Sequence, residues 1–161
     1  MSNKILITGA TGFIGSHLAE LCVEKGFSVV AFDRYNSNNN WGWLENSKYK
    51  NEMEIILGDV RDYDSVSKAI KGCNTVFHLA ALPSVPQSIT DPIKTAEVNM
   101  FGTLKVLEHS RNAGVKKVVF SSSCAIYGDN SKAQEILGWK YNLSFFDILE
   151  SLIKEEERNY I

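Results

Sequence analysis

The stretch from Lys4 to Gly15 most constrains this chain, because an apolar run leads directly into three glycines. Ile5, Leu6 and Ile7 are consecutive apolar residues, which is typical of a parallel strand buried on both faces. Apolar residues then recur at spacings of three and four after Gly12, which predicts a helix. A strand, a glycine turn and a helix in this order present free backbone N–H groups to a dinucleotide pyrophosphate.

Each of the three glycines has its own predicted role. Gly9 permits a sharp turn, Gly12 lets the backbone approach the phosphates without a Cβ in the way, and Gly15 allows close packing of helix on strand. A turn with tight packing and no ligand is the alternative, because short motifs also occur by chance.

An acidic residue at the end of the next apolar run favours the dinucleotide. Residues 27–32 form this run, and Asp33 follows it, 18 positions after Gly15. A carboxylate there accepts hydrogen bonds from the ribose hydroxyls of adenosine and repels a 2′-phosphate. Arg34 is a contrary signal, because a cation tolerates that phosphate. The sequence therefore predicts NAD rather than NADP as the cofactor.

Length and charge limit the other function classes. A chain of 161 residues forms one domain that buries roughly 70% of its unfolded surface. The net charge of -2 is spread along the chain, so we expect no nucleic-acid or membrane partner. No apolar run is long enough to span a membrane, and no signal-peptide pattern is present, which predicts a cytoplasmic location. The cysteines and histidines lack metal-ligand spacing, so no metal site is predicted.

Residues 35–51 are polar and irregular, and they predict a long surface loop. Trp41 and Trp43 are expected to fold back and anchor this loop. Because the loop follows Asp33, an aromatic side chain there could instead cover the adenine. Anchoring is the preferred interpretation.

Three further strands are predicted at residues 53–57, 75–79 and 115–120. Asp59 follows the first of these, at the edge where ligands bind in open α/β sheets. Its alternative role is to cap the next helix, which Asp62 or Asp64 could do instead. Ala80 and Ala81 follow the second strand and leave space for a ligand.

Asp91 and Pro92 begin a long helix that is predicted to run to about Ala113 and to end at Gly114. Its apolar residues cover more than one stripe, so it needs two partners, the sheet and a second surface. These residues are Ile93, Ala96, Val98, Met100, Phe101, Leu104, Val106 and Leu107.

Five strands alternating with helices predict an α/β fold, a doubly wound parallel sheet of Rossmann type with the first strand central. The ligand crevice then lies between the first and fourth strands. It is expected to be ringed by Gly9, Gly12, Asp33, Asp59, Ala80 and the serines at 121–123.

Several motifs together resemble the extended short-chain dehydrogenases, and within them the NAD-dependent sugar-nucleotide epimerases and dehydratases of the UDP-glucose 4-epimerase type. The motifs are Thr8–Gly15, Gly58-Asp59-Val60, His78-Leu-Ala-Ala81, Val98-Asn99 and Ser121–Gly128. The resemblance implies that NAD and a nucleotide sugar are the ligands.

The resemblance also implies roles for single residues. Ser123 matches the catalytic serine or threonine that hydrogen-bonds the reacting sugar hydroxyl. Ser121 is a further cofactor candidate, although a strand-end serine bonded to the backbone is the preferred interpretation for Ser121 and Ser122. The implied cofactor residues are Gly9, Gly12, Phe13, Ile14 and Gly15 at the pyrophosphate, Asp33 and Asn36 at the adenosine, Asp59 and Val60 at the adenine, Leu79, Ala80 and Ala81 toward the nicotinamide, and Asn99, which orders the site.

The family's base is a tyrosine followed four residues later by a lysine that lowers the pKa of the phenol. No tyrosine in this sequence has a lysine at that spacing. After Asn130 the chain passes to residues 131–140, which resemble a segment near the end of full-length members. The resemblance thus implies an internal deletion, with an NAD-binding domain at 1–130 and a C-terminal helical segment at 131–161 left from the substrate domain.

Residues 131–161 contain two capping boxes and an apolar stripe, so we expect them to form helices that cover apolar surface of the domain. In the family, the helix corresponding to 92–113 commonly lies at a dimer interface, which implies a homodimer through this helix and the C-terminal helix. NAD(H) binding without turnover is the preferred function. The alternatives are an active epimerase or dehydratase completed by a partner chain or by Tyr127 or Tyr141, and a structural protein with a collapsed crevice.

Overall fold

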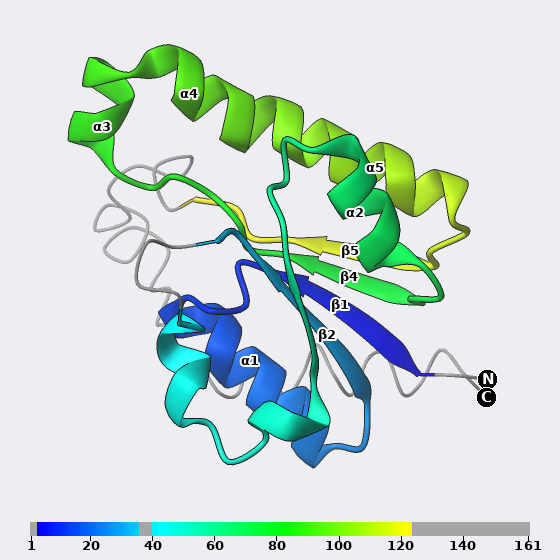
Figure 1. The fold of residues 1–161 in the computed structure, drawn as a ribbon. Helices are drawn as coiled ribbons and strands as arrows, with labels where there is room; N and C mark the ends of the chain where they lie inside the picture. Colours follow the sequence, from blue (N-terminus) through cyan, green and yellow to red (C-terminus); the bar gives the residue numbers. More distant parts are fainter. Residues whose placement is uncertain (1–2, 36–39, 124–161) are drawn as a thin grey trace, which may run out of the picture. The chain divides into compact units, whose positions relative to one another are not determined.

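The computed structural model describes residues 3–35 and 40–123. These residues form a five-stranded parallel sheet in the order β3-β2-β1-β4-β5, with β1 at the centre as predicted (Figure 1). The strands are β1 (Lys4–Thr8), β2 (Ser28–Asp33), β3 (Glu54–Leu57), β4 (Thr75–His78) and β5 (Lys117–Phe120). The predicted α/β fold class is confirmed.

Helices cover both faces of this sheet, which makes it doubly wound. Helix α1 (Phe13–Glu24) lies on one face, and α2 (Tyr63–Ile70) and α5 (Thr103–Asn112) lie on the other (Figure 1). The connection from β2 to β3 contains the short 3₁₀ turns η1 (Gly42–Asn46) and η2 (Lys50–Glu52), and α3 (Val85–Thr90) follows β4.

The central strand is buried on both faces, which explains its unbroken apolar sequence. Ile5, Leu6 and Ile7 are each at most 2% exposed. Leu6 is paired in register with Val30 on β2 and Val76 on β4, and all three belong to one core cluster. Because burying one such side chain stabilises the fold by about 1.5–3 kcal/mol, these residues fix the position of the turn that follows β1.

The helix predicted over 92–113 is not a uniform α-helix. Helix α4 (Pro92–Ala96) continues into a π-helical segment, η3 (Glu97–Gly102), and then into α5. Asp91 caps α4 as predicted, because its Oδ1 accepts a hydrogen bond from the Lys94 N–H at 3.1 Å. A Cβ on Gly102 would lie 2.8 Å from Val60 Cγ2, so the π-helical segment packs directly against the chain that follows β3.

The loop after β2 is anchored by a leucine. Leu44 is fully buried, whereas Trp43 is 61% exposed and meets the Phe13 ring edge-on at 5.2 Å between centroids. Trp41 lies under Lys50 Nζ at 4.2 Å from the ring centroid. The prediction that the tryptophans anchor this loop is therefore wrong for Trp43, because Leu44 and not Trp43 enters the apolar interior.

Some predictions fall outside the described residues. These are the roles of Asn36, Tyr127 and Tyr141, the boundary at residue 130 and the helices of 131–161. Within the described part, no helix combines the length and apolar character needed to cross a bilayer.

Candidate functional site

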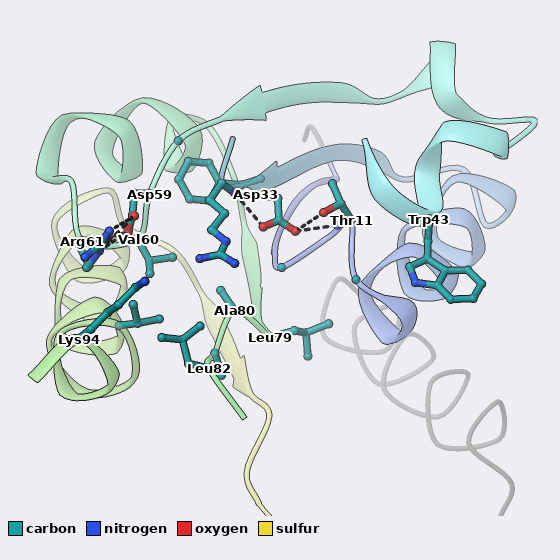
Figure 2. Close-up of a pocket in the computed structure, with 17 residues that line it drawn as sticks. Thr11, Asp33, Trp43, Asp59, Val60, Arg61, Leu79, Ala80, Leu82 and Lys94 are labelled. Atoms are coloured by element: carbon teal, nitrogen blue, oxygen red, sulfur yellow. Dashed lines mark hydrogen bonds and ion pairs between the residues drawn. The ribbon is translucent and has the colours of Figure 1, made fainter. Parts of the chain in front are cut away.

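The segments that follow β1, β2, β3 and β4 enclose one pocket of about 410 Å³ (Figure 2). This volume lies within the usual range of small-molecule sites. Its wall contains most of the residues predicted to hold a cofactor, namely Gly9, Gly12, Asp33, Asp59, Val60, Leu79, Ala80 and Ala81. Residues from separate predicted strands are thus brought together at one edge of the sheet.

The glycine turn has the geometry that its sequence predicts. Gly9 has a φ of +73°, and a Cβ there would lie 2.8 Å from the backbone nitrogen of Ala80. A Cβ on Gly15 would lie 2.2 Å from the Gly9 carbonyl oxygen, so α1 packs directly on the turn. Gly12 is the N-cap of α1 and no side chain caps the helix, which leaves its first N–H groups available to an anionic ligand.

Asp33 is tied to the glycine turn by its carboxylate. Its Oδ2 accepts hydrogen bonds from the Thr11 backbone N–H at 2.9 Å and from Thr11 Oγ1 at 2.6 Å, and its Oδ1 accepts one from the Arg34 N–H at 2.8 Å (Figure 2). A carboxylate has about four acceptor sites, so capacity remains for a ligand in the pocket. Asp33 therefore links β2 to the turn and still faces the cavity.

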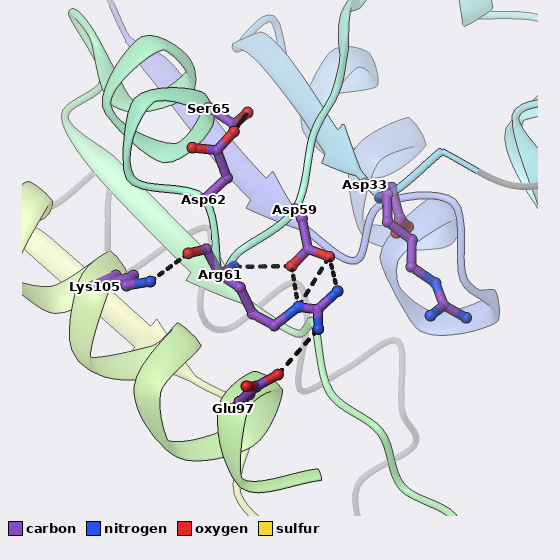
Figure 3. A network of polar contacts seen from close by, with 8 residues as sticks. Asp33, Asp59, Arg61, Asp62, Ser65, Glu97 and Lys105 are labelled. Atoms are coloured by element: carbon purple, nitrogen blue, oxygen red, sulfur yellow. Dashed lines mark hydrogen bonds and ion pairs between the residues drawn. The ribbon is translucent and has the colours of Figure 1, made fainter. Parts of the chain in front are cut away.

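Asp59 pairs with Arg61 rather than capping the next helix. Arg61 Nη2 lies 2.7 Å from Asp59 Oδ2, and Arg61 Nη1 lies 3.2 Å from Glu97 Oε2 on η3 (Figure 3). Hydrogen bonds from Arg61 lower the pKa of Asp59, which keeps this carboxylate charged. Asp62 caps α2, because it accepts hydrogen bonds from the Asp64 N–H at 3.0 Å and from Ser65 Oγ at 2.8 Å.

Two further cations line the pocket. The side chains of Arg34 and Lys94 make no hydrogen bond or ion pair within the described part of the chain. Together with the uncapped start of α1, they make the pocket suited to an anionic ligand.

Asn99 and Ser121 do not line the pocket directly. Asn99 bonds both backbone groups of Leu82: its Oδ1 accepts from the Leu82 N–H at 2.8 Å, and its Nδ2 donates to the Leu82 carbonyl at 3.1 Å. The Ser121 N–H donates to the His78 carbonyl at 3.1 Å, and the role of the Ser121 side chain stays a prediction. Ser123 lies in the second unit of the chain, 122–161, and its role stays a prediction.

The start of α1 exposes two apolar side chains beside the turn. Phe13 is 56% and Ile14 is 44% exposed. Their predicted contact with the pyrophosphate concerns the backbone, and the free helix start is compatible with it.

The sequence reasoning missed several residues of the pocket wall. Thr11 lies between Gly9 and Gly12, and its spacing from Asp33 gives no signal of their bond. Lys94 is separated from Leu82, the wall residue before it in the sequence, by eleven residues, so no local pattern identifies it. The missed residues are Thr11, Phe32, Gly58, Arg61, Leu82, Lys94 and Val98.

His78 lies buried behind the pocket wall. It is 2% exposed, and burial lowers its pKa to about 4, so the ring is neutral at pH 7. In the residues that the structure describes, no group of three or more histidine, cysteine or acidic side chains could hold a metal ion.

Comparison with known proteins agrees with this geometry. The model of the NAD dependent epimerase/dehydratase family matches residues 5–141. The chain belongs to this family.

Among the curated proteins similar to this chain are UDP-glucose 4-epimerases. The enzyme of Neisseria meningitidis serogroup C is 38% identical over 133 residues, which cover 80% of this chain and 39% of that enzyme. The enzyme of Klebsiella pneumoniae is 34% identical over 141 residues, which cover 80% of this chain and 95% of that sequence. The chain thus spans about two fifths of the length of the first relative.

Solved structures of the family share the fold. MoeE5 in complex with UDP-glucuronic acid and NAD has a TM-score of 0.65 and 37% identity over 78% of this chain and 38% of its own. The UDP-glucose 4-epimerase of Thermotoga maritima, with UDP-glucose, has a TM-score of 0.66 and 35% identity over 74% and 38% of the two chains.

Proposed function

We propose that this chain is an NAD(H)-binding domain of the sugar-nucleotide epimerase and dehydratase type, and that these 161 residues bind the cofactor without efficient turnover. The observation that best supports the proposal is the joining of Asp33 to the glycine turn by Thr11, within a pocket that Ala80 also lines. Beyond these structural bonds, the Asp33 carboxylate keeps acceptor capacity on the pocket side, which a ribose hydroxyl would use.

The residues fit the cofactor by their donors and acceptors. The N–H groups at the start of α1 and the backbone at Gly12 suit a diphosphate, because no Cβ or capping side chain covers them. Asp33 would hold the adenosine ribose, and Asp59 with Val60 would contact the adenine. The small side chains of Ala80 and Ala81 leave the wall open toward the nicotinamide. An open pocket of about 410 Å³ is also evidence against a collapsed crevice.

The bound nicotinamide would supply a reversible acceptor for hydride, and this chain's residues would orient it and exclude water. The tyrosine and lysine pair that supplies the family's base is absent from these residues. General acid–base catalysis contributes roughly 10²–10⁴ in rate. Orientation of the reacting groups lowers the activation barrier by about 7–11 kcal/mol. Ser123 remains the candidate that would hydrogen-bond a sugar hydroxyl.

Titration with NADH tests the proposal through Asp33. We expect Asp33→Asn to weaken NADH binding by roughly 10- to 100-fold, because a charged hydrogen bond contributes about 1.5–3 kcal/mol. The same change should weaken NADPH binding less, since it removes a charge that repels a 2′-phosphate. Fluorescence titration of both nucleotides gives the two dissociation constants.

Thr11→Val is the matched control, because it removes one hydrogen bond to Asp33 and leaves the carboxylate. We expect it to weaken NADH binding only a few-fold. If the wild-type protein binds no NADH at millimolar concentration, the proposed function is wrong. If Asp33→Asn binds NADH as tightly as the wild-type protein, Asp33 does not hold the ribose.

An active nucleotide-sugar epimerase or 4,6-dehydratase, completed by a partner chain or a substitute tyrosine, is the second candidate. The 38% identity to a UDP-glucose 4-epimerase favours it. Incubation with NAD and UDP-glucose, followed by chromatography, distinguishes the two. Formation of an epimer or a 4-keto product would show that the chain is catalytic, and the proposal of binding without efficient turnover would then be wrong.

We also propose that the protein is a homodimer, and the exposed face of the long helix supports this. Met100, Leu104 and Leu107 are 67%, 60% and 45% exposed, at spacings of four and three that put them on one side of the helix. Val106 on the same helix is fully buried, so the helix has the predicted second apolar face. Such a face is typical of a surface that another protein covers.

Leu104→Glu is expected to convert the dimer to monomer, because it would bury a charge without a partner in the interface. Sedimentation velocity over a range of concentrations measures the change. Asn112→Glu adds a charge at an exposed position of the same helix, five residues after Leu107 and away from this face, and should leave the association unchanged. A wild-type protein that sediments as a monomer at high concentration would contradict the dimer.

A further inference from the structure

A chain of hydrogen bonds runs behind the pocket wall from β1 through β4 to the long helix. The Ala80 N–H donates to Thr8 Oγ1 at 3.2 Å, and Thr8 Oγ1 lies 2.7 Å from His78 Nδ1. On the other side of the ring, His78 Nε2 lies 2.9 Å from Thr103 Oγ1, which donates to the Asn99 carbonyl at 2.7 Å. His78 therefore joins two threonines that belong to different layers of the fold.

The partners fix the direction of every bond in this chain. The Asn99 carbonyl can only accept, so the Thr103 hydroxyl donates to it and accepts from His78 Nε2. Nε2 must then bear the hydrogen of the neutral ring, which leaves Nδ1 to accept from the Thr8 hydroxyl. An apolar side chain of similar volume would break both links.

The same series of hydrogen bonds holds the short segment of residues 79–82. Residues 79–82 all line the pocket. Ala80 is bonded to Thr8, and Leu82 is bonded at both backbone groups to Asn99. Asn99 lies in the π-helical segment η3. This segment ends directly before Thr103, the first residue of α5. π-Helical segments are frequent at functional sites, and here the wider turn precedes the threonine that meets His78.

We propose that His78 is a positioning residue for the cofactor, because through Thr8 and Thr103 it fixes the backbone of residues 79–82 against the pocket. His78 touches no ligand itself in this arrangement, since it lies 2% exposed behind the wall. The inference rests on the proposed function, in that the nicotinamide end of NAD(H) is the group that this wall would meet.

Thr103→Val tests the inference at the link farthest from the pocket. This change keeps the shape of the side chain and removes the acceptor of the His78 N–H. We expect the dissociation constant for NADH to rise roughly tenfold, and amide hydrogen exchange at residues 79–82 of the ligand-free protein to become at least about tenfold faster. Thr103→Ser restores the hydroxyl and should return both values to those of wild type.

Ser110→Ala is the matched control for stability. Ser110 is 2% exposed on the same helix, and its Oγ donates to the Val106 carbonyl at 2.7 Å without contacting the pocket. Its loss should lower the melting temperature by a similar amount while leaving NADH binding and exchange at 79–82 unchanged. A merely structural role for His78 would make the two variants behave alike.

The outcomes separate this inference from the proposed function. If Thr103→Val leaves exchange at residues 79–82 at the rate seen in Ser110→Ala, the positioning role is wrong, whatever the protein binds. If the wild-type protein binds no NADH, the proposed function is wrong, and the exchange rates alone then decide whether the histidine fixes this wall.

Discussion

Replacing Gly9 with alanine is expected to lower the free energy of unfolding by roughly 2–5 kcal/mol and to remove detectable NADH binding. Two costs add at this position. Its φ of +73° costs an L-residue about 1–2 kcal/mol. The new Cβ would also lie 2.8 Å from the Ala80 backbone nitrogen, and such overpacking costs about 1–3 kcal/mol. Urea unfolding and NADH titration measure the two effects.

Gly72→Ala separates these two costs. Gly72 has nearly the same backbone angle, with φ of +77°, but a Cβ there would meet nothing within 4 Å. This variant should lose only about 1–2 kcal/mol and keep its NADH affinity. If both variants lose the same stability and both bind NADH, the close approach of the turn to β4 has no role in the site.

Acid should destabilise the protein through His78, by about 3 kcal/mol between pH 6.5 and pH 4. Burial lowers the pKa of this histidine from 6.5 to about 4 in the folded state. As the pH falls through this window, the unfolded chain binds a proton that the folded chain does not, so stability decreases. Each pKa unit corresponds to about 1.4 kcal/mol.

Comparison with His78→Asn isolates this contribution from those of the carboxylates. The variant is less stable at pH 7 because it loses one link of the hydrogen-bond chain, but its residue 78 does not titrate in this window. Its stability, measured by urea unfolding at several pH values, should therefore fall less steeply than that of wild type between pH 6.5 and 4. Equal slopes would show that His78 does not cause the acid sensitivity.

The sheet and the pocket edge were predictable because they depend on short-range patterns. The apolar run at 5–7 indicates a strand covered on both faces, and such a strand lies inside a parallel sheet. Once the order of strands and helices is known, the carboxyl edge contains whatever residues follow the strands. This is why the sequence alone predicts that Asp33, Asp59 and Ala80 lie in one pocket.

The details that connect those residues were not predictable from spacing. The Thr11–Asp33 and His78–Thr103 bonds depend on how separate elements meet in space. The π-helical segment packs closely against Val60 at Gly102. Its sequence has no feature that distinguishes it from an ordinary helix, so the predicted helix was continuous. Trp43 was expected inside, but the available interior accommodates Leu44.

The bond between Thr11 and Asp33 organises one end of the pocket before any ligand binds. The group that would meet the ribose and the backbone that would meet the diphosphate are already locked together in the ligand-free molecule. The protein therefore has little conformational freedom to lose at this end of the pocket when a ligand binds. This preorganisation should raise the affinity for adenosine-containing fragments such as AMP or ADP.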